Sequence, residues 1–325
     1  MREPPISAPP RAQFHQLHSE SNQDLIADLT RGLSAHPAYV SPKFFYDELG
    51  STLFGAITLL PEYYPTRTER ALMNEHGQAI AAAVGEVDVL IDLGAADCVK
   101  GEALMEWVSP RQYVPVDIST AYLHTAVDRL KRTHPGLQII GLGMDFFQGL
   151  TLTDDVLQDR RLFFYPGSSI GNLTPAEAQT LLSNIRQQCR TGGGLVIGVD
   201  RVKDSTVLTR AYDDSLGVTA TFNLNVLHRV NTLLGADFHC GDWQHVASFD
   251  AAASRIDMHL RARHATQVNL PTGVRGFAEG ECIHTESSYK YTPEAFTDLL
   301  RTAGFSRISH WTDDREWFSV FSARA

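Results

Sequence analysis

The feature that most restricts the fold of this chain is a regular alternation of apolar and amphipathic segments between residues 87 and 199. Apolar runs occur at 87–93, 113–116, 137–142, 162–165 and 195–199. The stretches between them have the capping residues and the apolar spacing of helices. Strands that alternate with helices form a parallel sheet with helices on both faces. The sequence therefore predicts an α/β fold with a doubly wound, mostly parallel sheet.

The stretch at 162–175 predicts where this sheet binds a ligand. An apolar strand is followed by two glycines, Gly167 and Gly171, and then by the capped start of a helix at 174–177. Asn172 is thus expected in a loop just past the carboxyl end of a strand, where open α/β sheets bind their ligands. The same spacing also fits an ordinary strand-to-helix turn, and spacing alone does not decide between the two.

The alternation stops at residue 201 and resumes near the end of the chain. Residues 255–261 alternate between polar and apolar side chains, which is typical of an antiparallel strand with one solvated face. We therefore expect an insertion with its own small sheet. A capped helix at 292–303 and two strands between residues 305 and 323 then return to the doubly wound pattern. Near the start, Thr66 and Glu69 predict a capping box for a helix that runs to about residue 84.

Composition excludes several classes of protein. The net charge of −10 argues against a surface that binds nucleic acid. No apolar run reaches about 18 residues, so no membrane span is expected. The four cysteines are far apart and the thirteen histidines include no metal-binding pair with a carboxylate between them, so we assign no metal and expect reduced thiols in a cytoplasmic protein. Residues 1–20 are proline-rich at their start and lack an apolar signal core, and we expect them to form a flexible tail.

The turn after the first strand of the alternation favours S-adenosylmethionine over NAD. A dinucleotide site would need Gly-x-Gly-x-x-Gly there, and only Gly94 is present. Asp117 ends the second strand, where its carboxylate can accept from ribose hydroxyls. Asp145 and Phe146 follow the third strand and can bind the adenine amino group and ring, while Lys100 can reach the methionine carboxylate. Each residue also has an ordinary interpretation, as a helix cap, a solvated loop acid or a solvated lysine.

Four longer motifs point to a known family. They occur in order as LPEYYPTRTE (60–69), GSSIGNLTP (167–175), RAYDD (210–214) with GVT (217–219), and TE (285–286) with Ser288. From residue 44 to its end the chain resembles the S-adenosylmethionine-dependent histidine Nα-methyltransferases of ergothioneine biosynthesis. One departure is Ala96, which replaces the second glycine of the usual Gly-x-Gly turn.

The resemblance implies a class I (Rossmann-like) methyltransferase domain at 67–202 and 290–325, and a second α+β domain at 21–66 and 203–289 that binds histidine. It implies transfer of methyl groups from S-adenosylmethionine to the α-amine of L-histidine, up to the trimethylated product hercynine, as the first step of ergothioneine biosynthesis. Implied cofactor contacts are Tyr46, Gly94, Lys100, Asp117, Asp145 and Phe146. Implied substrate contacts are Tyr63, Gly167, Asn172, Tyr212, Thr219, Phe222, Met258, Glu286 and Ser288. We expect a monomer whose partners are small molecules, with no nucleic acid and no membrane.

The residue types fit the chemical groups of histidine. Asn172 and Tyr212 can donate to the carboxylate of the substrate. Glu286 can accept from an imidazole N–H, with Ser288 on the other ring nitrogen, and a pocket built on such bonds rejects apolar analogues strongly.

The α-amine must be neutral when it attacks the methyl group. Tyr63 is the candidate for positioning the amine, and the Gly167 carbonyl or water for accepting a proton. The reference pKa of tyrosine, about 10, makes Tyr63 a poor base unless that pKa is shifted. The electron-rich faces of Tyr63 or Phe222 can tolerate the quaternary cation of the final product.

Two other interpretations stay open from the sequence. One is a related methyltransferase that acts on the α-amine of another amino acid, such as a tryptophan derivative. The other is a catalytically idle, regulatory S-adenosylmethionine-binding protein, for which the altered turn at 94–99 is the only support. Against the first of these, Glu286 with Ser288 favours imidazole.

Overall fold

The computed structural model describes residues 13–17 and 21–325 of the chain. Its larger sheet has eight strands, in the order β1 (Gln13–Gln16), β5 (Gln138–Gly143), β4 (Gln112–Asp117), β3 (Val89–Leu93), β6 (Arg161–Tyr165), β7 (Gly194–Asp200), β14 (Phe318–Arg324) and β13 (Ser306–Thr312). The strands from β1 to β7 pair in parallel, whereas β14 is antiparallel to both of its neighbours. The predicted doubly wound, mostly parallel sheet is therefore confirmed.

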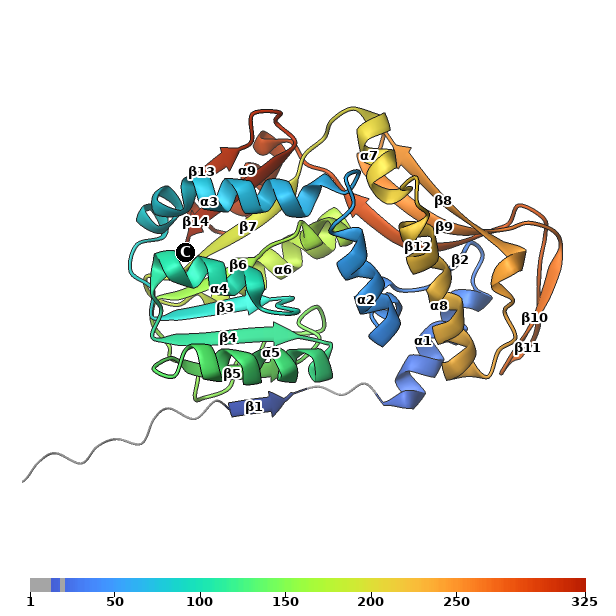
Figure 1. Cartoon of the computed structure of the whole chain (residues 1–325), viewed down its shortest axis with the longest axis horizontal. Coiled ribbons are helices and arrows are strands. Elements are labelled where there is room, and N and C mark those ends of the chain that lie inside the picture. Colours follow the sequence, from blue (N-terminus) through green and yellow to red (C-terminus); the bar gives the residue numbers. More distant parts are fainter. Residues whose placement is uncertain (1–12, 18–20) are drawn as a thin grey trace, which may run out of the picture.

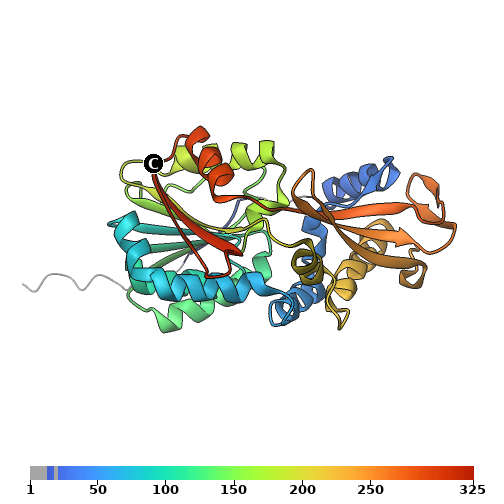
Figure 2. The ribbon, with the colours of Figure 1, turned by 90° about the horizontal axis from the view of Figure 1, so that it is seen from above.

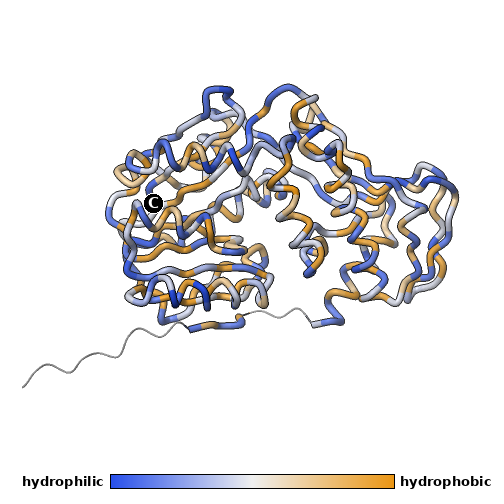
Figure 3. The backbone as a smooth tube through the Cα atoms, in the orientation of Figure 1, coloured by the Kyte–Doolittle hydropathy of each residue, from blue (hydrophilic) through white to orange (hydrophobic). Residues whose placement is uncertain are grey.

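Helices cover both faces of the large sheet (Figure 1). One face carries α3 (Tyr64–Val84), α4 (Val99–Val108) and α5 (Thr120–Thr133), and the other carries α6 (Pro175–Gln188) and α9 (Pro293–Thr302). Successive strand residues point to opposite faces, so Leu90 packs with α3 and α5 while Ile91 packs with α6. Both faces are buried, which explains why these strands are mostly apolar rather than alternating (Figure 3).

A second, smaller sheet has four strands, in the order β2 (Ala38–Tyr39), β12 (Cys282–Tyr289), β9 (Arg255–Ala262) and β8 (Trp243–Asp250). Around it lie η1 (Pro42–Phe45), α1 (Asn22–Ser34), α2 (Glu48–Ile57), α7 (Ser205–Tyr212), α8 (Val218–Leu234) and η3 (Cys240–Asp242), with a hairpin of β10 (Thr266–Leu270) and β11 (Gly273–Phe277). These elements share a hydrophobic core separate from the two faces of the large sheet. Figure 2 shows the two parts lying side by side.

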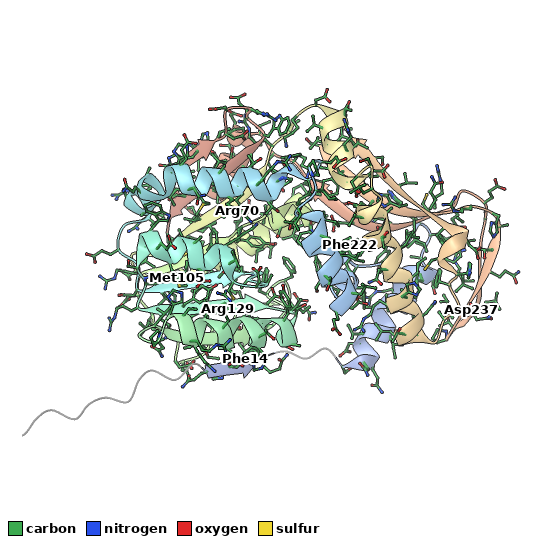
Figure 4. All side chains as sticks on the ribbon, viewed as in Figure 1. Phe14, Arg70, Met105, Arg129, Phe222 and Asp237 are labelled. Carbon is green, nitrogen blue, oxygen red and sulfur yellow. The ribbon has the colours of Figure 1, made fainter. Side chains whose placement is uncertain are left out.

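The predicted flexible tail needs a correction at 13–16. These residues form β1, which pairs in parallel with β5 at the edge of the large sheet. Phe14 stacks on His124 with ring centroids 3.6 Å apart, and its ring lies where a side chain at Gly141 would be (Figure 4). The rest of the predicted tail, 1–12 and 18–20, lies outside the described residues.

The capping box predicted for α3 is wrong. The helix begins at Tyr64 with Pro65 in its first turn, and no side chain caps its N-terminus. A proline in the first turn lacks only an N–H that would be unpaired anyway, so the helix starts there without a cap. Glu69 is instead 2% exposed and bonds to other elements. Among the described residues no helix is long and apolar enough to cross a lipid bilayer.

Candidate active site

The turn after β3 is open at its first glycine. Gly94 has a φ of 68°, and a side-chain carbon added there would meet no atom within 4 Å. Its amide donates to Val116 of β4 at 2.9 Å, which fixes the turn on the sheet. A ligand can therefore approach this backbone closely, as the sequence predicted for the cofactor turn.

Asp117, at the end of β4, holds the same turn from the other side. Its two carboxylate oxygens accept from the amides of Ala96, at 2.9 Å, and Ser119, at 2.8 Å. Burial raises the pKa of Asp117, and the two amide bonds oppose that rise. A carboxylate has about four lone-pair positions, so Asp117 can still accept from a pair of hydroxyls.

A cavity of about 780 Å³ opens beside these strand ends. Its lining includes two predicted cofactor residues, Tyr46 from the smaller part and Asp145 from the loop after β5. Phe146 is buried behind Asp145, against the rings of Phe147 and Tyr165. The cavity therefore has walls from both parts of the molecule.

Lys100 and Gly167, which the sequence assigned to different ligands, are joined through Glu69. The Lys100 ammonium lies 2.6 Å from the Glu69 carboxylate, and the Gly167 amide donates to that carboxylate at 2.8 Å. Gly167 has a φ of 81°, in the left-handed region that favours glycine. Sequence reasoning missed this role of Glu69, although the residue ends the longest of the four motifs.

Five aromatic rings form a continuous wall in the smaller part. The rings of Tyr63 and Tyr212 have centroids 6.5 Å apart, Phe54 lies 6.2 Å from Tyr63 and 6.1 Å from Phe222, and Tyr46 lies 6.0 Å from Phe222. Phe222 lies on α8 beside α2 (Figure 4). The structure therefore brings together four predicted site residues, and it adds Phe54, which no motif singled out.

Glu286 is a buried carboxylate close enough to this wall to act electrostatically on Tyr46, Tyr63 and Tyr212. It lies on β12 opposite Met258 of β9, and both residues are buried. Burial raises the pKa of Glu286 to about 7, and the ammonium of Lys290 opposes the rise. Its charge in turn raises the pKa of Tyr63, although burial is the larger cause there.

The Glu286 carboxylate receives no hydrogen bond from any described residue. Thr219, whose hydroxyl is buried, likewise has no partner in the described part of the chain. Buried polar atoms without partners cost stability unless a ligand supplies the missing bonds. Glu286 thus offers an acceptor suited to an N–H donor such as an imidazole.

Ser288 and Tyr212 form a hydrogen-bonded pair. The Tyr212 hydroxyl donates to Ser288 Oγ at 2.8 Å, and the buried Lys290 ammonium donates to both, at 2.9 and 2.7 Å. Lys290 also lies 2.9 Å from Asp200. The expected donation from Tyr212 to a substrate carboxylate differs from this arrangement, because its proton is already directed to Ser288. Sequence reasoning missed both Lys290 and Asp200.

The loop that carries Asn172 packs against the strand that carries Ser288. Asn172 ends the 3-10 helix η2 (Ser169–Asn172). A side-chain carbon added at Gly171 would lie 2.7 Å from the carbonyl oxygen of Tyr289 and 3.3 Å from Ser288 Oγ. The glycine therefore permits the close approach that brings Asn172 to the histidine side of the predicted site.

Among the described residues, no group of three or more His, Cys, Asp or Glu side chains could hold a metal ion.

Comparison with known proteins gives a consistent result. The family model described as "Histidine-specific methyltransferase, SAM-dependent" matches residues 25–325. The chain is 41% identical to the histidine N-alpha-methyltransferase of Mycolicibacterium smegmatis, over 88% of this chain and 90% of that one. It is 40% identical to the histidine N-alpha-methyltransferase of Mycobacterium tuberculosis, over 90% and 92%. The ergothioneine biosynthesis protein 1 of Neurospora crassa is 27% identical over 86% of this chain and 32% of its own length.

Among solved structures, the chain is similar to an S-adenosylmethionine-dependent methyltransferase from Clostridium acetobutylicum. The TM-score is 0.50 at 11% identity, over 84% of this chain and 98% of that one. At this identity the likeness speaks for the fold alone. It agrees with the class I, Rossmann-like arrangement of the large sheet.

Proposed function

The chain belongs to the family of histidine-specific, S-adenosylmethionine-dependent methyltransferases, and on that premise we propose that it methylates the α-amine of L-histidine. Glu286 carries the proposal. A buried carboxylate that receives no hydrogen bond from the described residues, beside an aromatic wall, suits the N–H of an imidazole. The alternative substrate, a tryptophan derivative, is not favoured, since an indole presents no second ring nitrogen to Ser288.

When bound, S-adenosylmethionine supplies an electrophilic methyl group on a sulfonium centre. We propose that Gly94, Asp117, Asp145 and Phe146 hold this cofactor at the carboxyl ends of β3, β4 and β5. The open turn at Gly94 and the fixed carboxylate of Asp117 support this assignment. Tyr46 lines the cavity beside these strand ends from the smaller part, so both parts of the molecule can contact the cofactor.

The residues around the α-amine orient it and form no covalent bond with it. Burial raises the pKa of Tyr63 well above its usual value, so its phenol stays protonated and can orient the amine but cannot act as the base. We propose that the Gly167 carbonyl holds an amine hydrogen and that the proton leaves to water. Alignment of nitrogen, methyl and sulfur then supplies most of the acceleration.

Repeated transfer up to the trimethylated product requires a site that tolerates a quaternary cation. The faces of Tyr63 and Phe222 supply electron-rich surface without hydrogen bonds that a fully methylated nitrogen would leave unmade. We propose that this wall is why the reaction continues to hercynine, as the first step of ergothioneine biosynthesis.

We propose the same division of labour between domains as the sequence predicted, with the cofactor bound by 67–202 and 290–325 and histidine bound by 21–66 and 203–289. The separate hydrophobic core of the smaller part supports this division. We also propose that the protein is cytoplasmic, which its four unpaired cysteines support, and that it acts as a monomer.

The direct test is incubation of the purified protein with S-adenosylmethionine and each standard amino acid in turn, followed by mass spectrometry. We expect histidine alone to gain one, two and three methyl groups. Methylation of a different amino acid would refute the histidine assignment, and no methylation at all would refute catalysis. A second test is Glu286→Ala, which should raise the Kd for histidine by about 10-fold or more. The Kd for the cofactor is the internal control and should stay within about twofold.

A further inference from the structure

A buried cluster of charges lies where the chain passes between the two sheets. Its centre is the Asp200 carboxylate at the end of β7, which is 1% exposed. Two ammonium groups, from Lys203 and Lys290, bind this carboxylate, and their side chains are 5% and 0% exposed. The neighbouring bridge between Arg201 and Tyr291 joins the strand ends of the two sheets. The mechanism proposed above uses neither lysine.

The two lysines are equivalent in their geometry toward Asp200 and its tyrosines. The Lys203 ammonium lies 4.4 Å from the ring centroid of Tyr64, and Lys290 lies 4.8 Å from that of Tyr212. Each ammonium also donates to the hydroxyl of its tyrosine, at 2.6 Å and 2.9 Å. Buried charges of this kind need such complete pairing to be tolerated.

They differ in their third partner. Lys203 donates to the backbone carbonyl of Arg201 at 2.6 Å, which is part of the scaffold. Lys290 donates instead to Ser288 Oγ at 2.7 Å, and Ser288 is a predicted substrate contact. Only one of the two lysines therefore touches the proposed histidine pocket.

The hydrogen-bond directions at Ser288 determine which ligand groups the pocket can bind. An ammonium has three donors and no acceptor, and those of Lys290 are all used, on Asp200, Tyr212 and Ser288. Ser288 Oγ accepts from Lys290 and from Tyr212, which occupies both of its lone pairs. Its own hydroxyl proton is then free, and Ser288 can only donate to a ligand.

We propose that Lys290 is a positioning residue for substrate specificity: it fixes Ser288 as a hydrogen-bond donor, so that the pocket selects a ring with an acceptor nitrogen on one side and, through Glu286, an N–H on the other. This inference rests on the proposed function. It explains why a buried cation lies two residues after the substrate-facing serine, just past the end of β12.

The charge of Lys290 makes this directionality permanent. Burial alone would lower the pKa of Lys290, but Asp200 and Tyr212 oppose it, and the pKa is raised overall. The ammonium therefore stays protonated near neutral pH and cannot switch to an acceptor. Ser288 keeps its donor role under the conditions in which the enzyme is assayed.

The test compares two substrates rather than one. The first is histidine, and the second is its pyrrole analogue, in which the acceptor nitrogen of the ring is replaced by C–H while the N–H is kept. Wild-type protein should use histidine with a kcat/KM about 10-fold or more above that of the analogue, because the Ser288 proton finds no acceptor on the analogue. Lys290→Met should bring this ratio close to one, chiefly by raising the KM for histidine.

Lys203→Met is the matched control, since it removes the other cation on the same carboxylate without touching Ser288. At about pH 7 both lysines are charged in the wild type, because burial lowers the pKa of Lys203 only to about 8. We expect Lys203→Met to reduce stability but to leave the substrate ratio within about twofold of the wild-type value. An equal fall of the ratio in both variants would refute the positioning role and leave Lys290 a purely structural cation.

Ser288→Ala extends the test if Lys290→Met does not fold, because it keeps both buried ions. It should remove the preference for histidine over the pyrrole analogue in the same way. A wild-type ratio near one, or a ratio that Ser288→Ala leaves unchanged, would overturn the inference while histidine methylation itself stands. Wild-type protein that methylates neither compound would instead refute the proposed function.

Discussion

At the scale of single residues, Glu69 and Glu286 are both buried carboxylates with opposite surroundings. Glu69 is bound by Lys100 and by the Gly167 amide, so its charge is neutralised within the protein. Glu286 receives no hydrogen bond from the described residues, and burial raises its pKa to about 7. A carboxylate in the second situation lowers the stability of the ligand-free protein and is free to bind substrate.

This difference predicts how stability depends on pH. The pKa of the Glu286 carboxyl is near 4.5 in the unfolded chain and about 7 in the folded protein, so the folded state binds its proton more tightly. Stability is therefore lost as pH rises from the lower value to the higher one. The glutamine of Glu286→Gln does not titrate. The unfolding free energy of this variant relative to wild type should therefore rise by roughly 1–3 kcal/mol between about pH 5 and about pH 8.

Urea denaturation of both proteins without ligand at the two pH values measures this difference. A difference in unfolding free energy that stays constant with pH would contradict the burial of an ionisable carboxyl at this position. The same variant should bind histidine more weakly, because the amide of glutamine carries no charge to strengthen the bond to the imidazole.

Sequence alone could predict Glu286 but not the buried charge cluster around Asp200. Glu286 lies in one of the four motifs that resemble a specific family. Lys290 and Asp200, in contrast, each look like ordinary charged residues at the end of a strand. Their partnership depends on β7 and β12 ending side by side, which a single sequence does not reveal. The role of Lys290 therefore needed the fold.

At the scale of elements, α4 packs directly against the sheet through Gly101. A side-chain carbon at Gly101 would collide with the Asp92 carboxylate of β3 and with the Tyr113 hydroxyl of β4. These two groups are buried and bonded to each other at 2.6 Å, so neither can move away easily. The glycine therefore sets how closely α4, and Lys100 on it, approaches the cofactor turn.

We expect Gly101→Ala to destabilise the protein by about 1–3 kcal/mol, because the added methyl group overpacks a filled core. Gly55→Ala is the matched control: Gly55 lies in the helix α2, and a methyl group there meets no atom within 4 Å. It should stabilise by about 0.5–1 kcal/mol, since alanine favours helix and restricts the unfolded chain. Thermal and chemical denaturation give both values, and equal effects of the two substitutions would contradict the packing described for Gly101.

The sequence revealed some elements and missed others. The strand β1 was missed because its four residues lie among proline-rich and polar ones, and its partner β5 is far along the chain. In the turn after β3, Ala96 replaces the glycine that is usual there. The structure shows why glycine is usual: Ala96 has a φ of 47°, in a region that costs glycine less than alanine. The alternating strands and helices between 87 and 199, by contrast, follow directly from their apolar pattern.

At the scale of the whole molecule, the cavity is bounded by both parts. Lys43 of η1, Thr52 of α2 and Tyr46 between these helices line it from the smaller part, and 118–122 and Asp145 line it from the side of the large sheet. A ligand that touches both walls links them energetically, because opening either wall breaks its contacts. Binding should therefore stabilise segments that are distant in the sequence.

Hydrogen exchange measures this coupling. Some amides in α2 and at the start of α5 can exchange only after the ligand is released. With S-adenosylhomocysteine at about 100 times its Kd, these amides should exchange about 100-fold more slowly. The hairpin of β10 and β11 does not line the cavity, and its exchange should not change. Protection confined to the large-sheet side would contradict a cavity shared by both parts.

The position of β14 in the large sheet has a consequence for synthesis. β7 lies between β6 and β14, and Asp200 at its end pairs with Phe318. All of the inserted smaller part therefore leaves the ribosome before the strand that completes this side of the sheet. Until then one edge of β7 has no neighbour, so the nascent chain depends on early folding of the insertion, or on a chaperone, to keep that edge from pairing with another polypeptide.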